Sequence, residues 1–459
     1  MTEGTAVSAA PVAPPSALVA LAWRLAPLWV GLGSLVLGAV GLGTRSLTSV
    51  EATSLAAADG PFRTVISTII RNDPAQAGQR LMLRLATTVG SDEWTIRVPS
   101  ALAAALAAGL LVILGTMLLG RVAGVVAGIA LAANAGVVVA SREARPYTLG
   151  ILGIVVVTLL FVIALERGGG WRWVPYGIAA AALPLFHPLA ASVLAAHGAA
   201  LLARRDRANL RVAGIAVVTG TCVTAFLLAW MAADRFDASA LGALDLGSLG
   251  RGVAGAGGWN PVLAVGAVVG VVFLFRAAHS SAPEPWIGVL VAGLIAAPIG
   301  VTLLAAVALP VHAGALVLCA PGVALGVGAV ALLLSPTRGL VTAGLAVLLL
   351  FSATTIAARL RQPVDEDWRA LAAAVKSVRG AKETVVVLPE GSGAAFAYYA
   401  PHLTTMRFAR GEGAWIAVRA RTADSAIDAS RPYVSTPRYA LLRQFRYGDD
   451  LRLQHWVRP

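Results

Sequence analysis

Residues 100–119 read SALAAALAAGLLVILGTMLL, and this stretch decides the class of fold. It carries no charged side chain across 20 residues. A helix of roughly that length is needed to cross the hydrocarbon core of a bilayer. The stretch forms most of an apolar run at 98–119 and predicts a transmembrane helix.

The whole composition agrees with this prediction. Of the 459 residues, 58% are hydrophobic and only 13% are charged, and the mean hydropathy is +0.78. Soluble domains are about half apolar and about a quarter charged, so an ordinary cytosolic enzyme is excluded. The chain is expected to be an integral membrane protein, and its net charge of +13 comes mainly from arginine.

Similar apolar runs recur along the chain, and they predict a mostly α fold: a polytopic transmembrane bundle of about eleven spans. The fifth and sixth runs are short and meet at Phe186-His187-Pro188, so they form either two tilted helices or one broken element. The expected spans lie near 22–43, 98–119, 122–140, 149–165, 174–186, 188–203, 212–232, 260–275, 286–309, 312–334 and 339–357.

The distribution of arginines predicts the orientation. The densest cluster, from Arg204 to Arg211, is expected in the cytoplasm, because short cytoplasmic loops carry an excess of basic residues. An odd number of spans then places the N-terminus inside and the C-terminus outside. Residues 1–21 are expected to be a disordered cytoplasmic tail, and loops 44–97 and 233–259 are expected outside the membrane.

The chain is expected to have two main parts, a transmembrane module at 22–357 and an extracytoplasmic α/β domain at 358–459. The second part is more charged and has no long apolar run. Asp367 to Arg379 has helical spacing, and Thr384 to Leu388 reads as a buried strand. Tyr439 to Phe445 and Leu451 to Val457 are weaker strand candidates.

The first external loop, 44–97, is too long for a simple connection. We expect a helix from Glu51 to Ala58 and an amphipathic helix from Ala77 to Val89, both lying near the membrane surface. Arg80 and Arg84 lie four residues apart on the second helix. They contact lipid headgroups or bind substrate, and the sequence favours the headgroups.

Charged and polar side chains gather where the third and fourth spans meet, in Arg142-Glu143-Ala144-Arg145-Pro146-Tyr147. Such a cluster either anchors the helices or holds a phosphate by charge-assisted hydrogen bonds. His187 and His312 lie at expected outer span ends, where they either donate to a phosphate or serve as ordinary interfacial histidines. The sequence predicts no cofactor and no tightly held metal, because its acidic and histidine residues lack metal-ligand spacing.

Four motifs in a fixed order resemble the GT-C class of polytopic glycosyltransferases, specifically the bacterial family related to protein O-mannosyltransferases and aminoarabinose transferases. The segment Arg142–Tyr147 is similar to the family's Gln-Glu-Ala-Arg-x-Tyr motif and is the most specific of the four matches. The other motifs are Ser46–Ala52, Ser91–Ala101 and Asp367-Trp368-Arg369.

The resemblance implies a transferase of the bacterial plasma membrane. A polyprenyl-phosphate sugar would donate its sugar, with inversion, to an extracytoplasmic glycan, lipid or protein acceptor. The other expected partners are membrane lipids, and nucleic acid is not expected, because the arginines are spread along membrane boundaries and the external tail. The implied base is Glu51, the implied donor phosphate-binding residues are Arg142, Arg145, His187 and His312, and the implied supporting residues are Glu143, Tyr147 and Asp73.

The chain departs from the family at the first motif, where Val50 stands in place of the aspartate of an Asp-Glu pair. Two hypotheses follow. Either Glu51, Asp59 or Asp73 acts as the base, or the fold is kept and the chemistry is lost, which leaves a lipid-binding or scaffolding protein. A transporter or flippase is a third interpretation, but the spans carry almost no acidic residues for an ion relay.

Overall fold

The structure is a computed structural model, and it describes residues 17–72, 76–168, 170–204, 214–215, 218, 222, 225, 246–277, 284–308, 313–362, 365–380, 383–409, 412–434 and 439–458. The expected tail at 1–21, the expected span at 212–232 and much of the expected loop at 233–259 lie largely outside these residues.

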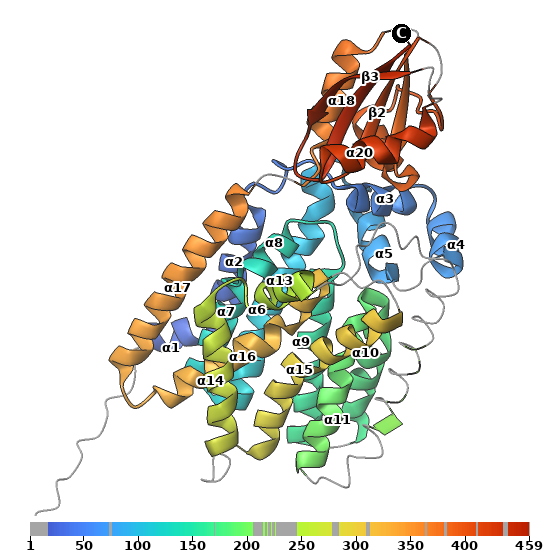
Figure 1. Cartoon of the computed structure of the whole chain (residues 1–459). Helices are drawn as coiled ribbons and strands as arrows, with labels where there is room; N and C mark the ends of the chain where they lie inside the picture. The colour runs from blue at the N-terminus through green and yellow to red at the C-terminus, as the bar shows by residue number, and fades with distance from the viewer. Residues whose placement is uncertain are drawn as a thin grey trace, which may run out of the picture.

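A bundle of apolar helices forms the larger part of the molecule, and a small sheet domain is attached to one end of it (Figure 1). This arrangement confirms the expected mostly α class with a small C-terminal α/β domain. The bundle elements are α1 Ala17–Arg24, α2 Ala26–Ala39, α6 Glu93–Leu119, α7 Arg121–Ala132, α8 Ala135–Ser141, α9 Tyr147–Arg167, η2 Gly170–Arg172, α10 Trp173–Phe186, η3 Pro188–Ser192, α11 Val193–Arg204, α13 Leu246–Ala256, α14 Pro261–Ala277, α15 Pro285–Ala308, η5 Ala313–Cys319, α16 Ala320–Leu333 and α17 Arg338–Arg361.

Within the described residues, five helices are long and apolar enough to cross a membrane, or up to seven if each of two bent pairs is one span. One bent pair is α7 and α8, which meet at 56° where Asn134 caps α8 and also donates to the carbonyl of Ala256 at 2.9 Å. The expected span at 122–140 is therefore broken. The total of eleven stays a prediction.

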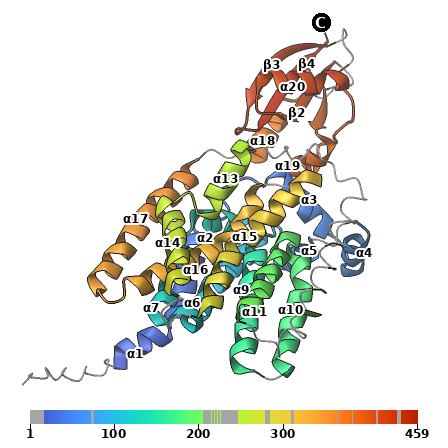
Figure 2. The same ribbon diagram turned by 60° about the horizontal axis from the view of Figure 1, so that its bottom comes forward.

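Small residues let the bundle helices approach closely, as is common in membrane proteins. A Cβ atom added to Gly270 on α14 would lie only 1.8 Å from the carbonyl oxygen of Gly326 on α16. Helix α17 is the exception, because it runs along the margin of the bundle in both ribbon views (Figures 1 and 2). Much of its apolar surface is therefore exposed to the surroundings.

The first external loop folds into three short helices, α3 Ser49–Ala58, α4 Phe62–Asn72 and α5 Ala77–Ala86. The expected helices beginning at Glu51 and Ala77 are confirmed within two residues, while α4 was not predicted. Helix α3 begins at Ser49 because Thr48 and Glu51 form a capping box, in which each side chain accepts from the backbone N–H of the other residue.

The C-terminal domain is a four-stranded sheet of order β1-β2-β4-β3. Strands β1 and β2 are parallel, and the other two pairs are antiparallel. The expected helix and the three expected strands are confirmed, whereas the central strand β2 was not predicted. The elements are α18 Trp368–Val378, β1 Glu383–Leu388, η6 Glu390–Ser392, α19 Gly393–Tyr399, β2 Gly413–Arg419, α20 Ala423–Ser430, η7 Arg431–Tyr433, β3 Ala440–Arg446 and β4 Leu451–Val457.

The C-terminal domain and the first external loop share one hydrophobic core. Leu47 and Leu55 from the loop pack in the same buried cluster as Trp368, Leu371 and Phe396 from the domain. Polar contacts join the same surfaces, since the Tyr399 hydroxyl accepts from the backbone N–H of Leu47 at 2.8 Å. The domain is therefore fixed on the loop rather than tethered beside it, as Figure 1 shows for α3 and the sheet.

Candidate functional site

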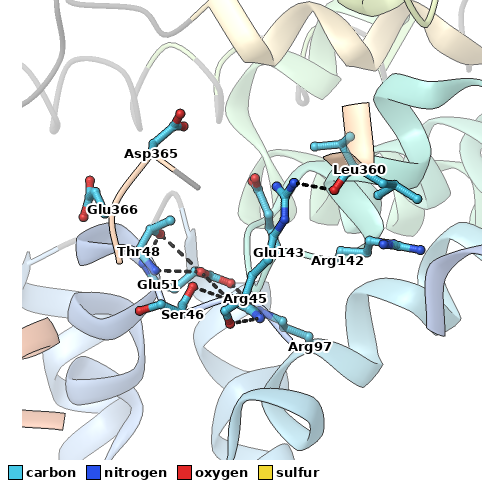
Figure 3. A pocket seen from close by; sticks show the side chains of 11 residues that line it. Arg45, Ser46, Thr48, Glu51, Arg97, Arg142, Glu143, Leu360, Asp365 and Glu366 are labelled. Atoms are coloured by element: carbon cyan, nitrogen blue, oxygen red, sulfur yellow. Dashed lines mark hydrogen bonds and ion pairs between the residues drawn. The ribbon is translucent and has the colours of Figure 1, made fainter. Parts of the chain in front are cut away.

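A pocket lies where the first loop, the turn between α8 and α9, the end of α17 and the start of the C-terminal domain meet (Figure 3). It is strongly charged, because four carboxylates and three arginines contribute to its wall. The lining residues are Arg45, Ser46, Thr48, Glu51, Arg97, Val139, Arg142, Glu143, Leu360, Asp365 and Glu366.

Glu51 is fully buried at the base of this pocket and is held by five hydrogen bonds. Its Oε1 accepts from Arg97 Nε at 2.9 Å and from the backbone N–H of Ala144 at 2.8 Å. Its Oε2 accepts from Arg97 Nη2 and the Thr48 N–H, both at 3.0 Å, and from the Thr48 hydroxyl at 3.2 Å. A carboxylate has about four lone-pair sites, so its capacity to accept is filled.

Arg97 is as tightly held as its partner. Its exposed fraction is 2%, and beyond Glu51 its guanidinium donates to the carbonyls of Leu42, Arg45 and Ser46 at 2.9 to 3.1 Å. Burial acts to raise the pKa of Glu51, but the hydrogen bonds and charge of Arg97, with the two backbone N–H groups, outweigh it and lower the pKa. The pair fixes the first loop to the start of α6.

These contacts favour a structural role for Glu51, although its assignment as the base stays a prediction. The neighbouring Val50, at the position of the family aspartate, is 44% exposed and does not line the pocket. Valine cannot accept a proton. The resemblance implies an aspartate at this accessible position, and the chain has no carboxylate there.

The motif Arg142–Tyr147 forms the tight turn between α8 and α9, and its charged side chains point in different directions. Arg142 lines the pocket and donates to the carbonyl of Leu37 at 2.9 Å. Arg145 pairs with Glu143, with 3.4 Å between its Nε and Oε2 of the glutamate. The turn thus places Arg142 and the Glu143 carboxylate at the pocket, and Arg145 lies beside Glu143.

Glu143 differs from Glu51 in having a loosely held carboxylate. Its side chain is 30% exposed, and Arg145 is its one ion-pair partner within the described residues. Burial raises the pKa of Glu143 despite the nearby charge of Arg145, and the negative charge of Glu51 adds to the rise.

A second polar group lies on the bundle side of the turn. Tyr147 follows Arg145 by two residues, and its ring lies 5.6 Å from the ring of His187. Gln79 on α5 donates to the carbonyl of Ala144. Within the described residues, His187 Nδ1 and Gln79 Oε1 are buried without a hydrogen-bond partner. Orphaned buried polar atoms are uncommon, so these two atoms are candidates for hydrogen bonds to a ligand.

Asp365 and Glu366 lie on the linker between α17 and α18, and the contacts of their two carboxylates differ. Glu366 accepts from the backbone N–H of Ser49 at 2.8 Å and from Trp368 Nε1 at 2.6 Å, and it pairs with Arg419 at 2.9 Å. It therefore joins the C-terminal domain to α3. Burial raises the pKa of Asp365, with further increases from the charges of Asp450 and Asp449.

The structure brings together six of the expected site residues: Glu51, Arg142, Glu143, Arg145, Tyr147 and His187. Asp73 and His312 lie outside the described residues. In the part of the chain that the structure describes, no group of three or more His, Cys, Asp or Glu side chains is arranged to hold a metal ion.

Sequence reasoning missed the partners that fix this site. Arg97 lies within the motif Ser91–Ala101, but the motif alone predicts no partner for it. The sequence likewise gives no signal that Asp365 and Glu366 belong to the site. One local signal was present: Thr48-Ser49-Val50-Glu51 matches the capping-box pattern, which already indicates a structural task for Glu51. The pairing of Glu51 with Arg97, 46 residues apart in the chain, has no local signal.

The family model described as dolichyl-phosphate-mannose-protein mannosyltransferase matches residues 78–231, which include the turn and His187. The match does not extend to Glu51 or the C-terminal domain. No curated protein matches the chain.

Two solved structures share the fold over almost the entire length. ArnT from Cupriavidus metallidurans bound to undecaprenyl phosphate matches with a TM-score of 0.56 and 13% identity, covering 95% of this chain and 98% of that chain. The same protein in the apo state matches with a TM-score of 0.54 and 14% identity, with the same coverage. The chain therefore has the architecture of the GT-C membrane glycosyltransferases, as expected.

Proposed function

We propose that this protein transfers a sugar from a polyprenyl-phosphate donor to an acceptor on the extracytoplasmic side of the membrane, with inversion. The observation that carries the proposal is the charged pocket between the helix bundle and the sheet domain. A lipid-linked donor needs a site at a membrane face, and the GT-C fold places this pocket at the end of apolar helices. The similar ArnT structure was solved with undecaprenyl phosphate bound.

The donor phosphate is assigned to the turn between α8 and α9. In this assignment Arg142 and Arg145 neutralise the phosphate charge, and His187 donates a hydrogen bond from the bundle side. Preorganised cations stabilise a leaving phosphate because its charge increases as the bond to the sugar breaks. In this assignment Tyr147 supports the site by packing its ring against His187. His312 and Asp73 remain part of the proposed site from the sequence alone.

Glu51 is assigned a positioning role rather than proton transfer. Its five hydrogen bonds leave no lone pair for an acceptor hydroxyl, and its pKa is lowered, which weakens it as a base. It holds the loop that forms one wall of the pocket.

The proposal is tested by reconstituting the purified protein in liposomes with a panel of undecaprenyl-phosphate sugars. We expect the release of undecaprenyl phosphate and the appearance of a glycosylated acceptor from envelope extracts. Arg145→Ala should lower kcat/KM on the order of 100-fold, as is typical when one charge-stabilising group is removed. Arg145→Lys should recover part of this loss.

The matched control is Arg167→Ala, at the opposite end of α9, where the side chain is exposed and far from the turn in sequence. It should leave kcat/KM within about twofold of the unmodified protein, because it removes an arginine from the far end of the helix that follows the turn without touching the site. Equal losses in the two variants would contradict the assignment of the phosphate to Arg145.

A second candidate function is lipid binding without transfer. The replacement of the family aspartate by Val50 and the full occupancy of the Glu51 carboxylate favour it. In the same assay this candidate predicts saturable binding of undecaprenyl phosphate, reduced in Arg145→Ala, with no turnover for any donor. If the protein neither binds undecaprenyl phosphate nor transfers a sugar, the transporter interpretation is the one that remains.

A further inference from the structure

An inverting transfer needs a base close to the acceptor hydroxyl, and four carboxylates face the pocket: Glu51, Glu143, Asp365 and Glu366. A base must have a lone pair that faces the substrate and is not already used by the protein. The hydrogen bonds of the four side chains therefore separate them into two groups.

Two of the carboxylates already accept hydrogen bonds and form ion pairs within the protein. Glu51 accepts five hydrogen bonds and holds the buried Arg97. Glu366 accepts from Ser49 and Trp368 and pairs with Arg419, so it is committed to joining the sheet domain to α3. Protonating either one would break contacts that fix the pocket walls.

The other two are free to react. Within the described residues, neither Glu143 nor Asp365 accepts a hydrogen bond with its carboxylate, and Glu143 has only the 3.4 Å ion pair to Arg145. Glu143 stands between the linker carboxylates and Arg142 in the close view (Figure 3). It is fixed in the short turn between two helices, whereas Asp365 is exposed on the linker.

The position of Glu143 relative to the donor site decides between them. The reacting carbon is attached directly to the donor phosphate, so the base must lie near the groups that bind that phosphate. Glu143 contacts Arg145, one of the arginines assigned to it. Asp365 instead lies against the sheet domain, where its backbone carbonyl accepts from the backbone N–H of Asp450 at 2.8 Å.

We propose that Glu143 is the base of this enzyme and takes over the task of the family aspartate that Val50 replaces. This inference rests on the proposed glycosyl transfer. The Glu143 carboxylate takes the proton of the acceptor hydroxyl while the acceptor oxygen bonds to the anomeric carbon. The bond from that carbon to the phosphate oxygen breaks, and its electron pair leaves with the polyprenyl phosphate beside Arg145. Water then removes the proton from Glu143.

The electrostatic surroundings suit this task. The groups that act on Glu143 are the positive Arg145 and Arg97 and the negative Glu51 and Asp365. Burial raises its pKa above the ordinary glutamate value, so it holds a proton more strongly than an exposed carboxylate and is a better base. It must be deprotonated to act, so activity should fall as the pH falls through its raised pKa.

The test compares Glu143→Gln with Asp365→Asn and with Glu390→Gln, an exposed glutamate of the sheet domain as the matched control. Undecaprenyl-phosphate sugar turnover and undecaprenyl phosphate binding are measured for each. Glu143→Gln should lower kcat at least on the order of 100-fold, the contribution expected of a general base. It should bind undecaprenyl phosphate within about threefold of the unmodified protein, because only the proton acceptor is lost.

Glu143→Asp should retain part of the activity, and the acid side of the kcat/KM profile should be absent from the residual activity of Glu143→Gln. A protein that is active with its donor but is unaffected by Glu143→Gln would overturn this inference and leave the proposed function intact. A large loss in Asp365→Asn alone would overturn it in favour of Asp365. No turnover by the unmodified protein with any donor would instead contradict the proposed function itself.

Discussion

At the residue scale, the contrast between Glu51 and Glu143 explains how one pocket can hold two glutamates with different tasks. Glu51 is enclosed by Arg97 and backbone N–H groups, which favour its charged form. Burial and the negative charge of Glu51 favour the protonated form of Glu143, and together they outweigh the positive charge of Arg145. Opposite shifts of pKa in neighbouring acids often accompany a division of roles.

Glu51→Gln should destabilise the folded protein by about 3 to 5 kcal/mol, because it leaves the buried guanidinium of Arg97 without its counter-charge. The measurement is the thermal unfolding midpoint in detergent, followed with a fluorescent probe. Replacing both partners, as Glu51→Met with Arg97→Met, should recover part of the loss, since no unpaired charge remains. A Glu51→Gln protein that is as stable as the original would contradict the structural role.

The same variant predicts a pH dependence. The pKa of Glu51 is lower in the folded state than in the unfolded chain, so its stabilisation is present above the unfolded pKa and is lost as the pH falls through the folded value. The difference in unfolding midpoint between the original protein and Glu51→Gln should therefore shrink below about pH 4.5. A difference that stays constant to lower pH would contradict the lowered pKa.

At the element scale, the sheet domain is stabilised by elements that the sequence places far apart. Helix α18 packs its apolar face on the sheet, and the same core continues into α3 of the first loop. Strand β2 lies between β1 and β4 and reads GAWIAVR, which alternates poorly because both of its faces are covered. A fully buried strand lacks the alternation that sequence analysis detects.

Trp368→Ala should loosen this shared core, because Trp368, the first residue of α18, is fully buried where the helix packs on the first loop. Removing a large buried aromatic side chain typically costs about 3 to 5 kcal/mol. We expect faster hydrogen exchange in α3 as well as in α18, measured by mass spectrometry. The control is Leu442→Ala on β3, where the leucine is exposed. Faster exchange confined to α18 would show that the two parts do not share a core.

At the scale of the whole molecule, the pocket exists only because the sheet domain is placed on the end of the bundle. Its walls come from the first loop, the turn after α8, the end of α17 and the linker. Arg45 adds a further link, since it donates to the carbonyls of Arg359, Leu360 and Gln362 at the end of α17 at 3.1 to 3.3 Å. The helix bundle and the sheet domain therefore form one site.

The orientation of the molecule gives the last prediction. We expect the sheet domain outside the membrane and the loop between α9 and α10 in the cytoplasm. After Cys222 and Cys319 are replaced by serine, Leu442→Cys should react with a membrane-impermeant maleimide on intact cells. Trp171→Cys, exposed on that loop, should react only after permeabilisation. The reverse pattern would contradict the positive-inside assignment.

The sequence by itself determined the mostly helical membrane class, the positions of most described helices and the strands of the sheet domain with alternating or β-branched residues. These are local properties, because hydropathy, helical spacing and caps act over a few residues. Even the start of α3 could be predicted from the pattern Thr48-x-x-Glu51.

Only the tertiary structure decided which carboxylate is held and which is free. Glu51 and Glu143 are the same residue type, and the one local signal that separates them, the capping box of Thr48 and Glu51, accounts for only part of the hydrogen bonds to Glu51. The difference comes from Arg97 and Ala144, which reach Glu51 from distant segments, and from the single arginine beside Glu143. Hydrogen bonds between segments depend on how the helices pack, and packing is a property of the whole chain.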